Sequence, residues 1–159
     1  MPPVAQTATL RIERLCKHHR VSEFVSTNPT MDETLRTYHG RLDAGEETVV
    51  FVASTSDMRV DGFVAIADFD PVAAVGSSST MYLFISAVAV DIRATNRFLA
   101  TRLMKKVIEV GRLRIRDQRR NYTGLLAMDV GDNTANWLAK AKFKPFDDFP
   151  PYFWRPIEP

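Results

Sequence analysis

The ten residues 81–90, MYLFISAVAV, are apolar along their whole length apart from the hydroxyl groups of Tyr82 and Ser86. A run of this length is too short for a membrane-spanning helix, which needs about 20 apolar residues. Its aromatic and β-branched residues favour a strand, and the absence of alternation with polar residues predicts that both faces of the strand are covered. We therefore expect a sheet with residues 81–90 at its centre and helices on both faces.

The rest of the chain divides into segments with strand or helix patterns. A polar turn between residues 48–53 and 60–69 predicts a β-hairpin. Thr30 and Glu33 form a capping box at the start of the second predicted helix, and Gly45 ends that helix. Further strands are expected at 9–15, at 124–130 and within 143–157, helices at 18–27, 30–44, 97–117 and 133–142, and a loop at 71–80. This order predicts an α/β (α+β) fold with a mixed sheet, in a single domain that spans residues 1–159.

The basic residues are unevenly distributed. The chain has 21 basic and 19 acidic residues, and a net charge of +2 does not by itself imply nucleic-acid binding. Residues 102–120, however, hold eight basic side chains and only two acidic ones, Glu109 and Asp117. A stretch of this kind attracts phosphate groups, and the part from Arg112 to Arg120 is a candidate site for a phosphate-rich partner. The alternative is the solvated face of a helix.

The cysteine and histidine content limits the chemistry. Cys16 is the only cysteine, so the chain has no internal disulfide and no cysteine-ligated zinc, which favours a reducing compartment. The N-terminus lacks the pattern of a secretory signal, so we expect a cytoplasmic protein with no membrane association. No group of His, Asp and Glu has metal-ligand spacing, and no metal is expected.

Two local sequences carry a resemblance to a known family. The first is the strand end Ala-Val-Ala-Val-Asp at residues 87–91, which is followed by a basic loop and a long helix. The second, at residues 133–143, begins Asn-Thr-Ala and ends at Phe143. Together with the order of elements, they resemble the GNAT acetyltransferases, which have a mostly antiparallel mixed sheet and use acetyl-CoA. Aligned from Asp91, the family's three loop glycines correspond to Asn96, Phe98 and Ala100.

The resemblance implies a cofactor site at the N-terminus of the helix that follows the loop. There, backbone N–H groups of the helix bind the pyrophosphate of acetyl-CoA. The implied residues are Val88, Ala89, Val90, Arg93, Asn96, Arg97, Phe98, Leu99, Ala100, Thr101 and Asn133. Phe98 leaves two readings open. Either its ring packs into the core and Arg93, Arg97 and Arg102 replace the lost backbone contacts, or the ring closes the groove and the fold serves as a scaffold.

Candidate catalytic residues are few. The strand at 81–90 carries no carboxylate, and its polar side chains, Tyr82 and Ser86, lie on one face by alternation. Asp68 and Asp70 either reach the same cleft as a general base or simply form the turn before Pro71. The family's usual acid, a tyrosine, corresponds here to Leu138, so Tyr152 is the expected substitute unless it only packs against the sheet. The three histidines His18, His19 and His39 fall in the first two predicted helices, either as a base or as solvated side chains.

Two functions follow from these observations. The first is an N-acetyltransferase that moves the acetyl group of acetyl-CoA to the amine of a small molecule, a protein or a tRNA, because GNAT toxins that acetylate charged tRNA share the compact hairpin and a basic stretch. The second is an inactive GNAT-fold binding or structural module, for example in a phage particle or a regulatory complex. Its partner would dock on the aromatic tail around Trp154. A homodimer is left open.

Overall fold

The computed structural model describes residues 10–45, 47–69, 81–94, 98–117, 122–128, 138–146 and 152–157. Its elements, in chain order, are β1 (Arg11–Arg14), α1 (Pro29–Gly40), the short 3-10 helix η1 (Leu42–Ala44), β2 (Val49–Ser54), β3 (Val60–Phe69), β4 (Met81–Val90), α2 (Leu99–Asp117), β5 (Tyr122–Met128), β6 (Lys144–Pro145) and β7 (Tyr152–Pro156). The strands form one sheet in the order β1-β2-β3-β4-β5-β7-β6. Strands β4 and β5 are parallel, and the other described pairs are antiparallel. The predicted mixed, mostly antiparallel sheet is confirmed.

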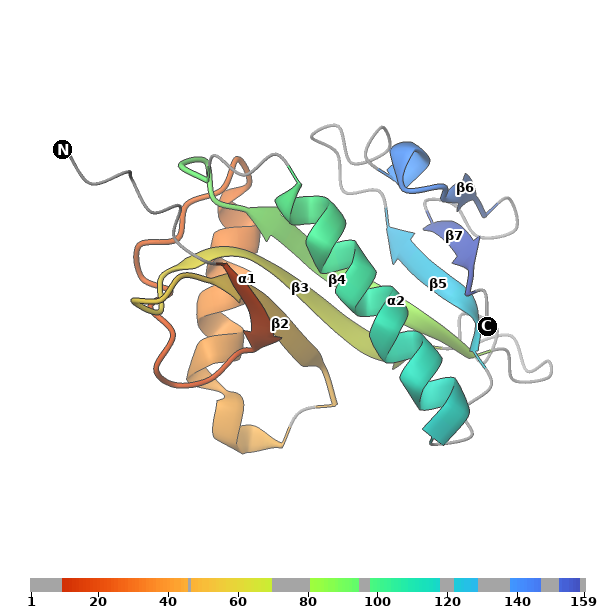
Figure 1. Cartoon of the computed structure of the whole chain (residues 1–159), viewed down its shortest axis with the longest axis horizontal. Helices are drawn as coiled ribbons and strands as arrows, with labels where there is room; N and C mark the ends of the chain where they lie inside the picture. The colour runs from red at the N-terminus through yellow and green to blue at the C-terminus, as the bar shows by residue number, and fades with distance from the viewer. Residues whose placement is uncertain are drawn as a thin grey trace, which may run out of the picture.

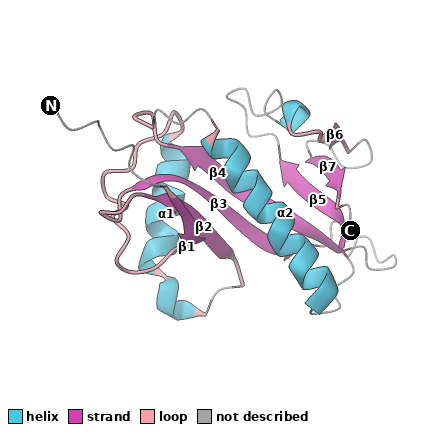
Figure 2. Cartoon of the chain, in the orientation of Figure 1, coloured by secondary structure: helices cyan, strands magenta, loops and turns pink. Residues whose placement is uncertain are grey.

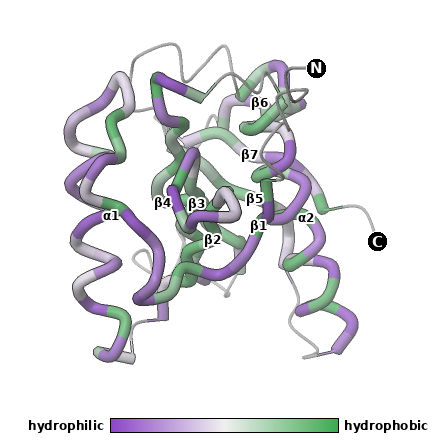
Figure 3. The backbone as a smooth tube through the Cα atoms, turned by 60° about the vertical axis from the view of Figure 1, so that its left-hand side comes forward, coloured by the Kyte–Doolittle hydropathy of each residue, from purple (hydrophilic) through white to green (hydrophobic). Residues whose placement is uncertain are grey.

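The helices α1 and α2 lie on opposite faces of this sheet (Figures 1 and 3). On the α2 face the core contains Val64, Leu83 and Leu103, and on the α1 face it contains Leu35 and Phe63. A Cβ atom at Gly62 of β3 would lie 3.2 Å from methyl groups of both Leu99 and Leu103. The absence of a side chain at Gly62 therefore allows α2 to pack closely against the middle of the sheet.

Helix α1 begins at Pro29, one residue before the predicted helix 30–44, and its N-cap lies two residues before the predicted N-cap, Thr30. Its N-cap is Asn28, whose side-chain oxygen accepts a hydrogen bond from Thr30 N–H at 3.0 Å. Pro29 follows in the first turn, where a missing N–H costs nothing. The predicted capping box at Thr30 and Glu33 is therefore wrong, because Thr30 is already inside the helix. The predicted end at Gly45 is wrong for α1, which ends at Gly40; Gly45, with φ 68°, is instead the C-cap of η1.

The helix predicted at residues 18–27 is absent, and turns connect β1 to α1 (Figure 2). The imidazole of His19 is buried here, with Cys16 N–H donating to its Nδ1 at 2.9 Å and its Nε2 2.9 Å from Glu13 Oε1. Phe24 is also buried and meets Phe63 edge to face. A side chain that binds a backbone group in its own turn competes with helix formation, and these contacts replace the helical hydrogen bonds.

The other elements agree closely with their predicted positions. Strand β5 begins at Tyr122, two residues before its prediction, and the described part of the predicted helix 133–142 is helical at 138–140. The predicted loop 71–80 lies outside the described residues. Within the described part of the chain, no helix is long and apolar enough to cross a membrane.

Candidate functional site

Strands β4 and β5 separate halfway along β4. Their parallel pairing begins with Met81 opposite Tyr122 and ends with Ile85 opposite Ala127. Beyond that point, the described part of β4 pairs with β3 alone, from Ala87 to Val90. Figure 1 shows the tip of β4 running away from the tip of β5. Ser86 is the extra residue of a β-bulge at the point of separation, and bulges of this kind re-aim a strand.

Beyond Ile85, the edge of β4 that faced β5 has no described strand partner, and we call this edge of β4 the opening. Asp91 N–H donates to Asp61 O at 2.8 Å, so these two residues are a hydrogen-bonded pair in the antiparallel ladder that β4 forms with β3. Because hydrogen-bonded and non-bonded pairs alternate in such a ladder, Ala89 exchanges hydrogen bonds with β3. Val88 and Val90 then direct their N–H and C=O groups away from β3, on the side where β5 no longer pairs. The opening thus presents backbone donors and acceptors of the central strand.

The N-terminus of α2 is formed by Phe98. Arg102 N–H donates to Phe98 O at 2.9 Å, so Phe98 is the N-cap residue, and its side chain is 70% exposed. The reading in which Phe98 anchors the core is therefore wrong. That role belongs to the next residue, Leu99, which is 1% exposed and packs against Gly62. A phenyl ring offers no hydrogen-bond acceptor, so it cannot cap the N–H groups of Ala100 and Thr101.

The arginines expected at the phosphate loop contact the protein itself. Arg93 places its Nε 2.9 Å from Oδ1 of Asp91 and a terminal nitrogen 2.9 Å from Oδ2. Burial of Asp91 raises the pKa of its carboxyl, but the hydrogen bonds from Arg93 and Val25 outweigh this and hold that pKa at about 2. Arg102 donates to Leu10 O at 3.1 Å. Thr95, Asn96, Arg97 and Asn133 lie outside the described residues.

Two of the three candidate catalytic side chains lie where β4 leaves β5. Ser86 forms the bulge, and its hydroxyl donates to Ala65 O at 3.3 Å. Tyr152 pairs with the last residue of β5, and its ring is 6.0 Å from that of Phe84. Tyr82 is instead buried beside Phe146 in the paired part of β4. Of these three candidates, Ser86 and Tyr152 are the two beside the point where β4 and β5 separate.

The other titratable candidates face elsewhere. Asp68 lies on the α2 face, where Tyr122 OH donates to it and Arg114 is 3.3 Å away. Because of this pairing, the Asp68 carboxylate does not point to the opening. Asp70 lies outside the described residues. His19 is buried against Glu13, and hydrogen bonds from Ser54 and His19 lower the pKa of that carboxyl. His39 contacts Lys17 O, and His18 is exposed. In the described segments, no cluster of three or more His, Cys, Asp or Glu side chains could hold a metal.

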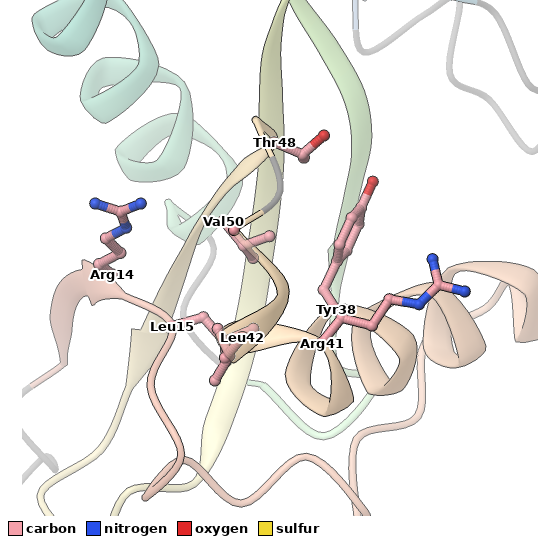
Figure 4. A pocket seen from close by; sticks show the side chains of 8 residues that line it. Arg14, Leu15, Tyr38, Arg41, Leu42, Thr48 and Val50 are labelled. Atoms are coloured by element: carbon pink, nitrogen blue, oxygen red, sulfur yellow. The ribbon is translucent and has the colours of Figure 1, made fainter.

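A pocket also lies between the end of α1 and the β1–β2 edge (Figure 4). Its lining includes the apolar side chains of Leu15 and Leu42 and the polar side chains of Arg14, Tyr38 and Arg41. The two guanidinium groups point away from one another, so they do not converge on a single anion (Figure 4). No described residue that lines this pocket belongs to β4 or α2, which separates it from the opening.

Comparisons with known proteins identify the fold. No protein-family model matches the chain, and no curated protein matches its sequence. Among solved structures, it is similar to the AtaT toxin complexed with acetyl-methionyl-tRNAfMet, at 13% identity, with a TM-score of 0.77 over 93% of this chain and 95% of that chain. A tyrosine-to-phenylalanine mutant of AtaT, bound to the C-terminus of the antitoxin AtaR and acetyl-CoA, gives 14% identity and a TM-score of 0.77 over 94% of each chain. The KacTA–DNA complex gives 14% identity and a TM-score of 0.76 over 94% of each chain. The chain therefore has the fold of these solved structures, which agrees with the GNAT-like fold that the resemblance in its sequence implied.

Proposed function

We propose that the protein is an N-acetyltransferase that uses acetyl-CoA. The observation that carries the proposal is the opening, the edge of β4 beyond its pairing with β5, where Val88 and Val90 present backbone groups. The N-terminus of α2, with Phe98 at the N-cap, supplies further N–H groups, and α2 is the next described element after β4 in the chain. Such a helix end binds phosphate, so a cofactor can place its pyrophosphate on α2 and extend its acyl arm along β4. The neighbouring AtaT structure that contains acetyl-CoA supports this choice of cofactor.

The reaction needs few protein groups. The acceptor amine attacks the thioester carbonyl carbon, a C–N bond forms, the C–S bond breaks, and the amine loses a proton. Val88 N–H is the donor that we assign to the carbonyl oxygen, where negative charge develops. Tyr152 is our candidate to protonate the departing thiolate, with Ser86 as the second hydroxyl at the opening. The base that deprotonates the amine is a bound water or a residue outside the described part.

For the acceptor, we propose the amino group of an aminoacyl-tRNA. One neighbour is AtaT in complex with an acetylated aminoacyl-tRNA. In this protein a shallow groove runs along the outer side of α2, lined by Lys105, Ile108, Glu109, Arg112, Leu113 and Arg116. Three of these six side chains are basic and exposed, which suits a phosphate backbone. Arg114, which the basic stretch also included, is turned to Asp68 and contributes less.

Thermal unfolding with acetyl-CoA tests the cofactor, and acetylation of charged tRNA tests the acceptor. Acetyl-CoA at about 100 times its Kd should stabilise the fold by about 2.7 kcal/mol. An Ala100→Glu variant should lose this stabilisation, because it places a carboxylate among the phosphate-binding N–H groups. Arg116→Glu, at the far end of the same helix, is the control that keeps cofactor binding and loses tRNA acetylation. Absence of any shift in the wild type at millimolar acetyl-CoA would refute the proposal.

The second candidate function is an inactive binding module. Leu138, at the position of the family's tyrosine, is fully buried and cannot transfer a proton. If Tyr152 does not replace it, the opening holds a cofactor without turnover. A normal thermal shift with no acetylation of any amine, and identical behaviour of Tyr152→Phe and wild type, would favour this alternative. The homodimer and the cytoplasmic location remain predictions.

A further inference from the structure

Asp91 is a buried carboxylate that the sequence analysis used only as the end of the strand motif, without assigning it a role. Its side chain is 1% exposed, directly beyond the end of β4. Four donors surround its two oxygens. Arg93 N–H and Nε donate to Oδ1 at 2.8 and 2.9 Å, and a terminal nitrogen of Arg93 and Val25 N–H donate to Oδ2 at 2.9 and 3.1 Å. A buried carboxylate with this many donors is ionised and rigidly held.

The same contacts join two segments that are 66 residues apart in the chain. Val25 N–H donates to the Asp91 carboxylate, and Val25 O accepts a hydrogen bond from Ile92 N–H at 2.9 Å. The guanidinium of Arg93 also donates to Glu23 O. Residues 23–25 and 91–93 are thus connected by main-chain and side-chain hydrogen bonds, and we call this set of contacts the Asp91 clamp.

Each segment leads into one of the two main helices. One residue beyond Val25, Ser26 donates from its N–H and its hydroxyl to Asp32 of α1, at 2.8 and 2.6 Å. On the other side, Ala94 N–H closes a turn onto Asp91 O, and α2 begins at Leu99. The clamp therefore connects the approach to α1 with the approach to α2, across the end of β4.

From this arrangement we infer that Asp91 is a positioning residue, which holds the start of α2 against the open end of β4 so that both can contact one cofactor. The inference rests on the proposed function only for the identity of the cofactor. It also changes the role of Arg93. The sequence resemblance placed Arg93 on the phosphates, whereas the clamp assigns it to Asp91 and makes its effect on the cofactor indirect.

A double-mutant cycle separates the two roles of Arg93. The Kd for acetyl-CoA is measured by calorimetry, at a temperature where every variant is fully folded. We expect Asp91→Asn and Arg93→Gln each to raise Kd about tenfold, and the double variant to raise it no further, because both substitutions break one clamp. If Arg93 binds phosphate directly, the increases in Kd from the two substitutions multiply, and the double variant raises Kd about a hundredfold. That result overturns the inference.

Asp61→Asn is the matched control. Asp61 is also buried, at 7% exposure, and its carboxylate pairs with Arg59, which stands two residues earlier in the chain, directly before β3. A loss of stability without a change in Kd is expected for this variant. An Asp91→Asn protein that behaves in the same way, less stable but with unchanged Kd, shows a merely structural role for Asp91.

Hydrogen exchange gives a readout that needs no cofactor. Without ligand, Asp91→Asn should speed exchange at Val25 and Ile92 and at the first hydrogen-bonded amides of α2, and Asp61→Asn should not. Unchanged exchange at these amides would overturn the inference even if acetyl-CoA binds. If wild type binds no acetyl-CoA while exchange changes as expected, the proposed function fails, and the clamp stands as the element that positions α2.

Discussion

Replacing Phe98 tests both its place in the fold and its effect on the helix end. The ring is 70% exposed, so Phe98→Ala removes only about a third of the contacts that a buried phenylalanine makes. Full burial of such a side chain stabilises by about 1.5 to 3 kcal/mol, so we expect a cost of about 0.5 to 1 kcal/mol. A phenylalanine in the core would cost about 3 to 5 kcal/mol.

Phe98→Asp should be more stable than Phe98→Ala. As the N-cap residue, aspartate can accept hydrogen bonds from the first turn of α2, which contributes about 1 kcal/mol, and its charge adds about 0.3 to 1 kcal/mol at the helix N-terminus. The two variants should then differ in Tm by about 3 to 6 °C, measured by circular dichroism. Acetyl-CoA should raise the Tm of Phe98→Ala and leave that of Phe98→Asp unchanged, because the carboxylate occupies the N–H groups and repels phosphate.

Two results would refute this reasoning. A loss of 3 kcal/mol or more in Phe98→Ala would show that the ring is a core anchor after all. Equal stability of the alanine and aspartate variants would show that Phe98 is not the N-cap. Neither result depends on whether the protein binds a cofactor, so the structural part of the prediction can be judged separately from its functional part.

Three further predictions follow from described contacts. Gly124→Ala should destabilise the protein severely, since its Cβ would lie 2.4 Å from Arg155 O in the β5–β7 pair, and chemical denaturation measures the loss. The free energy of unfolding should fall as the pH drops from about 4 to 2, because the pKa of the Asp91 carboxyl is 3.8 in the unfolded chain and about 2 in the folded protein. At neutral pH the Asp91 carboxylate contributes about 2 kcal/mol of stability, so Asp91→Asn should flatten the pH dependence of stability between pH 4 and 2. Arg102→Gln should leave the Kd for acetyl-CoA within twofold of wild type in calorimetry, because its guanidinium is bound to Leu10 O.

The strands could be read from the sequence because their signal is local. Strands β3 and β4 occupy the predicted residues 60–69 and 81–90, where runs of β-branched and aromatic residues mark a buried sheet without reference to any other part of the chain. Helix α2 was similarly visible from its periodicity. The N-cap of α1 was missed, because Asn28 and Thr30 are both good capping residues and the choice between them depended on Pro29.

The site was only partly predictable. The sequence indicated the segment, from the end of β4 to the start of α2, but not the orientation of its side chains. Nothing local distinguishes a buried Phe98 from an exposed one; the close approach of α2 to Gly62 gives the core position to Leu99 instead. Ser86 was noted as a hydroxyl, yet its place in a bulge emerged only from the pairing of β4 with β3.

By itself, the sequence determined the central strand, its neighbours and the helix that follows it, because hydrophobic periodicity acts between residues close in the chain. Only the tertiary structure decided that residues 18–27 are not a helix and that Arg93 turns to Asp91. The contact between Val25 and Asp91 spans 66 residues, and its energy exists only after the sheet has brought the two segments together. Local patterns in the sequence do not encode such a contact, so the fold could be predicted from the sequence, whereas the Asp91 clamp at the end of β4 could not.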